Sequence, residues 1–138
     1  MIRIGMIGCG FIGSQHFWGI RSLARSGILD AAVTHVYDKD EQRAVRFGSS
    51  NGIEVCPDLA HLVASVDAVW VCSWTAGHLE AVKAAADRGL PLFCEKPLAR
   101  TLDGCEELAQ AARKVPHQVG LLLRHAPALK AMREIVRS

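Results

Sequence analysis

The chain has 138 residues, which is enough for one domain with a single hydrophobic core. Half of its residues are hydrophobic, 22% are charged and the formal net charge is +2, as in an ordinary globular protein. The chain carries no basic run, no apolar stretch of roughly twenty residues and no export signal, so we expect neither nucleic-acid nor membrane partners.

Apolar runs of strand length alternate with segments of helix length, and this alternation predicts an α/β fold. In chain order we expect strand Ile2–Ile7, helix Ser14–Arg25, strand Ala31–Tyr37, helix Asp40–Phe47, strand Ile53–Cys56, a brief helix from Pro57 through Val63, strand Asp67–Ser73, helix Thr75–Arg88, strand Pro91–Glu95, helix Thr101–Lys114, strand Val119–Leu123 and helix Pro127–Val136. Helix ends are predicted at Gly27, Gly48 and Gly89.

Six strands joined by right-handed crossovers predict a doubly wound, mainly parallel sheet with helices on both faces. The expected strand order is 3-2-1-4-5-6. In such a sheet the ligand crevice opens at the carboxyl ends of the first and fourth strands.

A glycine motif lies between the first strand and the first helix, and it reads Gly8-Cys9-Gly10-Phe11-Ile12-Gly13. Gly8 permits the tight turn, Gly10 leaves room for a pyrophosphate, and Gly13 lets the helix approach the strand. The helix N-terminus then faces the phosphate charge. This context predicts a Rossmann fold that binds a dinucleotide. A P-loop is disfavoured because Ser14-Gln15, not Lys-Ser or Lys-Thr, follows Gly13.

An acidic residue, Asp38, ends the second predicted strand, 25 residues after Gly13. A carboxylate there accepts hydrogen bonds from the adenosine ribose and repels the 2′-phosphate of NADP. NAD is therefore the preferred cofactor. Lys39 and Arg43 lie nearby in the sequence and leave NADP open.

Cysteine occurs five times at widely spaced positions, namely Cys9, Cys56, Cys72, Cys94 and Cys105. None forms a C-x-x-C pair, so we expect buried thiols in a reducing cytoplasm and no metal site.

The tripeptide Glu95-Lys96-Pro97 follows the fifth predicted strand. Together with the glycine motif it resembles the amino-terminal domain of the glucose–fructose oxidoreductase/inositol dehydrogenase (Gfo/Idh/MocA) family. Further segments are similar to motifs of that family, namely Pro57-Asp58-Leu59, Ser73 to His78, Phe93 to Leu98 and Val119 to Pro127. Trp74 departs from the pattern, since the family usually has proline there.

The resemblance implies roles for several residues. Lys96 would act as the catalytic residue near the nicotinamide and a substrate hydroxyl, with Glu95 orienting it and Pro97 following a cis peptide bond. Ser73, Trp74 and His78 would join the cofactor site. For His78, helix capping and a purely structural role stay open. His16 would either approach the cofactor or face solvent, and Arg124 would meet substrate or an interdomain partner.

The resemblance also implies that residues 1–124 form the NAD(P)-binding domain and that 125–138 begin the connection to a substrate domain absent from this chain. We expect a dehydrogenase of a sugar, polyol or related alcohol, inactive in this isolated form because half a site cannot orient a substrate. A stand-alone NAD(H)-sensing module is the alternative, and a domain for another nucleotide is a weaker one. Apolar residues of the last helix should drive self-association, namely Ala128, Leu129, Met132, Ile135 and Val136.

Overall fold

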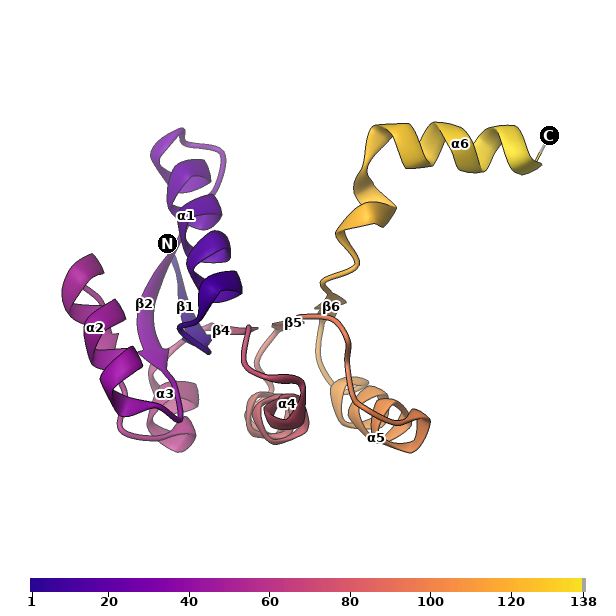
Figure 1. Cartoon of the computed structure of the whole chain (residues 1–138). Coiled ribbons are helices and arrows are strands. Elements are labelled where there is room, and N and C mark those ends of the chain that lie inside the picture. Colours follow the sequence, from indigo (N-terminus) through magenta and orange to yellow (C-terminus); the bar gives the residue numbers. More distant parts are fainter. Residues whose placement is uncertain (138) are drawn as a thin grey trace.

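The computed structural model describes residues 1–137, and Figure 1 shows them with the sheet seen nearly edge-on. All neighbouring strands are parallel, and their order is β3-β2-β1-β4-β5-β6, as predicted. The strands are β1 Ile2–Ile7, β2 Ala31–Tyr37, β3 Glu54–Val55, β4 Ala68–Val71, β5 Leu92–Cys94 and β6 His117–Val119. The doubly wound α/β fold is therefore confirmed.

Helices lie on both faces of the sheet, and each of the first five connects two successive strands. They are α1 Phe11–Arg25, α2 Glu41–Asn51, α3 Leu59–Ser65, α4 His78–Asp87, α5 Leu102–Ala112 and α6 Pro127–Arg137, with short 3-10 turns η1 Thr75–Gly77 and η2 Leu122–His125. In the part of the chain that the structure describes, no helix has the length and apolar character needed to cross a membrane.

Two hydrophobic clusters form the core, one on each face of the sheet. On one face α1 and α2 pack against β1 and β2, for example through Phe17, Met6 and Val36. On the other face α3, α4 and α5 pack against β1, β4 and β5, with Leu62 and Val82 fully buried. Both faces of the central strands are covered, which explains their nearly continuous apolar sequences.

Two predicted helix boundaries were wrong for identifiable reasons. Helix α1 begins at Phe11 rather than Ser14, because extended Gly10 is its N-cap. Gly48 does not close α2. It is buried inside the helix, where an added Cβ would meet Val55 and the Ile53 carbonyl oxygen. The helix ends at Gly52, whose left-handed φ of 68° suits glycine.

The sixth strand was also predicted at the wrong place. It ends at Val119, and Leu122–His125 forms a 3-10 turn where the prediction placed a strand end. The reason lies in its partner strand. The last ladder bond joins the Gly120 amide to the Cys94 carbonyl oxygen at 2.9 Å, and β5 ends there. Among the described residues no strand lies beside segment 121–123, so its apolar character alone does not make it extended.

Candidate functional site

The glycine motif forms the turn between β1 and α1. Gly8 has φ +99°, and a Cβ there would lie 2.5 Å from the Ser73 amide nitrogen. A Cβ on Gly13 would collide with the Gly8 carbonyl oxygen. On Gly10, by contrast, a Cβ would meet no described atom within 4 Å. The two outer glycines are thus required by the protein itself, whereas Gly10 leaves open space beside the α1 N-terminus.

Asp38 follows β2 and is fixed against this turn. Its Oδ2 atom accepts a hydrogen bond from the Cys9 amide at 2.8 Å, and its Oδ1 atom accepts one from the Asp40 amide at 2.9 Å. Its side chain is only 9% exposed. A carboxylate has about four acceptor positions, so Asp38 keeps capacity for the hydroxyls of a ribose while its orientation is already set.

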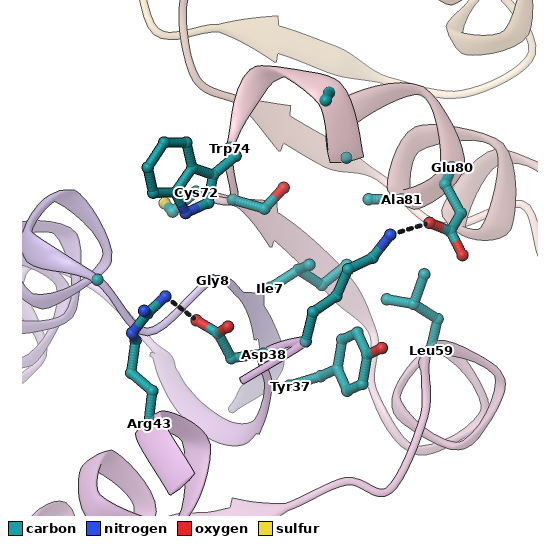
Figure 2. Close-up of a pocket in the computed structure, with 15 residues that line it drawn as sticks. Ile7, Gly8, Tyr37, Asp38, Arg43, Leu59, Cys72, Trp74, Glu80 and Ala81 are labelled. Carbon is teal, nitrogen blue, oxygen red and sulfur yellow. Dashed lines mark hydrogen bonds and ion pairs between the residues drawn. The ribbon is translucent and has the colours of Figure 1, made fainter. Parts of the chain in front are cut away.

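A pocket of about 230 Å³ opens beside Asp38 and Gly8 (Figure 2). It lies at the carboxyl edge of β1, β2 and β4. Its walls are largely apolar and include Ile7, Tyr37, Leu59, Cys72 and Ala81. An apolar wall next to a fixed carboxylate suits an adenosine group, whose base is aromatic and whose ribose carries hydroxyls.

Charged side chains ring the same pocket. The Lys39 Nζ atom lies 2.9 Å from Glu80 Oε2, and this contact joins the end of β2 to the first turn of α4 (Figure 2). Arg43 lies 3.5 Å from the Asp38 carboxylate and 3.1 Å from that of Asp40. Glu80 was not recognised from the sequence, because the helix dipole alone explains an acidic residue in a first helical turn.

Around Glu95 the structure brings two elements together. Glu95 is 3% exposed, and its Oε1 atom lies 2.7 Å from His16 Nε2 on α1. Its Oε2 atom accepts a hydrogen bond from the Lys96 amide at 2.9 Å. Gly120 lies over this carboxylate, and a Cβ there would come within 2.8 Å of it. Neither the His16 contact nor the need for glycine at position 120 was recognised from the sequence.

Lys96 lies at the same edge of the sheet as the glycine motif, since both follow the carboxyl ends of parallel strands. Its side chain is exposed, and the Lys96–Pro97 peptide bond is cis. Asp38 follows β2 and Lys96 follows β5, so β1 and β4 lie between them. The carboxyl edge of the sheet, referred to below as the crevice, therefore runs from the pocket beside Asp38 past the glycine motif to Lys96.

The remaining candidates occupy different positions. Trp74 is 81% exposed at the rim of the pocket, and Ser73 lines it. Phe11 is exposed at the start of α1, and Ile12 is partly buried there. Arg124 lies in η2 and not at a strand end.

His78 is buried beneath the pocket wall. Its Nε2 atom lies 2.9 Å from the Ser73 carbonyl oxygen, and its Nδ1 atom lies 3.2 Å from that of Leu98. The ring thus joins the loops that follow β4 and β5. Gly77, not His78, is the N-cap of α4.

The thiols beside the glycine motif are not suited to nucleophilic chemistry. Burial and, next in effect, the negative charge of Asp38 together raise the pKa of Cys9 to about 12. Burial likewise raises the pKa of Cys94 to about 12 and that of Cys72 still more. These thiols stay protonated near neutral pH. Among residues 1–137, no group of three or more His, Cys, Asp or Glu side chains could hold a metal ion.

The residues present fit a dinucleotide. Gly10 leaves a space that a Cβ would enter, the α1 N-terminus faces it, and Asp38 supplies a fixed carboxylate. Ser73 adds an independent sign, because its buried Oγ atom has no hydrogen-bond partner within the described residues although it lines the pocket. A buried hydroxyl without a partner is costly, and a bound ligand would supply one.

Comparison with known proteins agrees with this geometry. The chain is 39% identical to inositol 2-dehydrogenase 3 of Saccharopolyspora erythraea over 98% of its length and 37% identical to an inositol 2-dehydrogenase of Cereibacter sphaeroides over 99%. An NAD binding oxidoreductase from Klebsiella pneumoniae superimposes with a TM-score of 0.83 at 30% identity, over 99% of this chain and 38% of that one.

The scyllo-inositol dehydrogenase of Lactobacillus casei, solved with NAD(H) and scyllo-inositol, shares the fold at 24% identity, with a TM-score of 0.83 over 99% of this chain and 41% of its own. The chain spans about 40% of the length of the two curated relatives. The family described as "Oxidoreductase family, NAD-binding Rossmann fold" matches residues 2–122, and the chain belongs to this Gfo/Idh/MocA family.

Proposed function

We propose that this chain is the cofactor-binding part of an NAD-dependent dehydrogenase that oxidises an inositol, a sugar or a related polyol. The observation that carries the proposal is the fixed carboxylate of Asp38 beside the open face of Gly10, at the edge of the sheet where Lys96 also lies. One end of this edge suits adenosine ribose and the other carries a cation for a substrate hydroxyl.

Each end of the crevice has its own task. At the adenosine end, Asp38 accepts hydrogen bonds from the ribose, and the α1 N-terminus faces the pyrophosphate. Bound NAD supplies the hydride acceptor. At the other end, the Lys96 side chain stabilises negative charge that develops on a substrate oxygen or moves its proton. The buried Glu95 carboxylate holds the Lys96 amide and so fixes where this side chain begins.

The substrate class rests on the relatives, whose names identify them as inositol dehydrogenases. An alcohol must be held against the nicotinamide for hydride transfer. Residues 1–124 form the cofactor domain in this proposal, and 125–138 lead towards the region that would hold the substrate. Ser138, at the end of that segment, lies outside the described residues.

Because the cofactor domain alone cannot hold the alcohol in place, the isolated chain should bind NAD(H) without oxidising inositols, sugars or other polyols. The free cysteines agree with a location in the reducing cytoplasm.

The test is a fluorescence titration of the chain with NADH and NADPH, comparing the native protein with Asp38→Ala. We expect native protein to prefer NADH, and Asp38→Ala to weaken NADH binding at least about tenfold, because hydrogen bonds to a charged group are lost. No binding of either cofactor to the native chain would refute the proposal, and equal affinity for both would refute the preference for NAD.

A matched control separates binding from folding, because Asp38 also holds the Cys9 and Asp40 amides. Asp58 caps α3 by accepting a hydrogen bond from the His61 amide at 2.7 Å. Asp58→Ala removes a comparable carboxylate–amide contact outside the pocket lining. If it weakens NADH binding as much as Asp38→Ala does, the loss reflects stability and not ribose recognition.

A further inference from the structure

We infer that Glu80 is a second determinant of cofactor choice, because its carboxylate already contacts Lys39, a cation that could otherwise attract the 2′-phosphate of NADP. The inference rests on the proposed NAD-binding function and assigns a role to a residue that has no place in the glycine motif.

Two cations lie close enough to the end of β2 to attract a phosphate on the adenosine ribose. Arg43 is held within its own segment, since the carboxylates of Asp38 and Asp40 both contact it. Asp40 is also the N-cap of α2, and its side chain accepts a hydrogen bond from the Arg43 amide at 3.0 Å. The Arg43 guanidinium therefore already contacts two carboxylates, and backbone amides hold both of these in place.

Lys39 has no such local arrangement. Its charged end reaches from the end of β2 to Glu80, on a helix 41 positions later in the chain, and their contact is 2.9 Å long. Both residues line the pocket that holds Asp38 (Figure 2). The hydrogen bond that Lys39 donates to Glu80, followed by the negative charge of Glu80, raises the pKa of Lys39. The Lys39 ammonium group is thus protonated, and the Glu80 carboxylate already balances its positive charge.

The consequence for cofactor choice follows from charge balance. Asp38 repels a 2′-phosphate, and a free ammonium group one residue away would offset part of that repulsion. With Glu80 in place, the phosphate would have to replace a carboxylate that Lys39 already contacts. Lys39 and Glu80 are 70% and 59% exposed, so their pair is a weak surface contact and its effect on selectivity should be moderate.

The experiment measures the ratio of the NADPH and NADH dissociation constants for the chain and four variants. Glu80→Gln keeps the shape of the side chain and removes its charge. We expect it to shift the ratio towards NADPH by about fivefold, the size that one exposed ion pair supports. Lys39→Gln should not produce this shift, and the double variant Lys39→Gln/Glu80→Gln should lose it, because the gain needs the released ammonium group. Raising the salt concentration to about 0.5 M should reduce the gain.

Glu41 provides the matched control. It is a first-turn glutamate like Glu80, but it belongs to α2 and lies outside the pocket lining. Glu41→Gln changes the net charge near Asp38 by the same amount, and we expect no shift in the ratio. An equal shift in Glu41→Gln, an unchanged ratio in Glu80→Gln, or a gain that persists without Lys39 would each overturn the inference.

The failure of the inference can be distinguished from the failure of the proposed function. If the native chain binds no NADH at all, both fail. If the native chain binds NADH but Glu80→Gln leaves the ratio unchanged, only the inference fails.

Discussion

The imidazole of His16 and the carboxylate of Glu95 approach to 2.7 Å, and they connect the helix of the glycine motif to the loop that carries Lys96. The pair is nearly buried, with the side chains 15% and 4% exposed. The His16 ring also lies edge-on to Phe93, with 5.0 Å between the ring centroids. The helix of the glycine motif and the loop that carries Lys96 are therefore joined by a polar contact beside aromatic side chains.

Replacing His16 by Phe should destabilise the fold by about 2 kcal/mol, because a buried carboxyl group loses one of its hydrogen-bond partners. The measurement is urea unfolding with linear extrapolation. Glu95→Gln is the conservative comparison, since an amide can still accept from the Lys96 amide and donate to His16. We expect its loss to be smaller than that of His16→Phe. A larger loss for Glu95→Gln would show that the charge, and not the hydrogen-bond geometry, holds this region.

Alanine at Gly10 and alanine at Gly13 should behave in opposite ways. In Gly13→Ala the new Cβ collides with the backbone oxygen of Gly8, so we expect a loss of at least about 2 kcal/mol in stability. Gly10 has φ −80°, which alanine adopts readily, and its Cβ would meet no described atom within 4 Å. Gly10→Ala should fold with a stability within about 1 kcal/mol of native and bind NADH much more weakly. Thermal unfolding and NADH titration on the same samples distinguish the two cases. Full NADH affinity in Gly10→Ala would place the pyrophosphate elsewhere.

The start of β1 should depend on pH through Asp67. Arg3 donates to this carboxylate from its side chain at 2.7 and 3.0 Å and from its amide at 2.8 Å, and these bonds lower the pKa of Asp67 to about 2. Because the folded-state pKa is depressed, the contribution to stability is present above about pH 4 and is lost as pH falls towards 2. Asp67→Asn should lower the melting temperature by about 1–3 °C at pH 6, a small effect because the pair is exposed.

The same experiment has an internal check. Arg3→Gln should reproduce most of the decrease in melting temperature seen in Asp67→Asn. Added salt should reduce the difference in melting temperature between the native protein and either variant. A difference between Asp67→Asn and native protein that stays constant from pH 6 to pH 2 would contradict this account.

The last helix should mediate self-association. In Figure 1, α6 extends away from the sheet, and the structure records no buried residue among positions 127–137. Its exposed apolar side chains include Leu129, Met132 and Val136. Such a surface favours a symmetric pair, so light scattering should report a dimer at high concentration and a monomer for Met132→Glu. Lys130→Gln, on the same helix, is the control and should remain associated. A native chain that stays monomeric at all concentrations would refute the prediction.

The sequence alone determined the features that depend on local rules. Alternation of apolar runs with helical segments predicts the parallel sheet, and the spacing of Gly8, Gly10 and Gly13 reflects steric limits within a single turn. Asp38 was found because it ends the strand that follows the motif. Glu95, Lys96 and Pro97 were found through a family resemblance, and their position at the crevice edge follows from parallel strands ending on one side.

The contacts between segments far apart in the sequence were decided only by the tertiary structure. Lys39 contacts Glu80 across 41 positions of the chain, and His16 contacts Glu95 across 79. A lysine or a histidine in a sequence does not by itself indicate so distant a partner. The end of β6 was decided by where β5 stops, and the need for glycine at 48 and 120 was decided by the atoms of Val55 and Glu95 packed against them. Periodicity and turn chemistry act within a few residues, whereas close packing between elements depends on the strand order and on the paths of the crossovers.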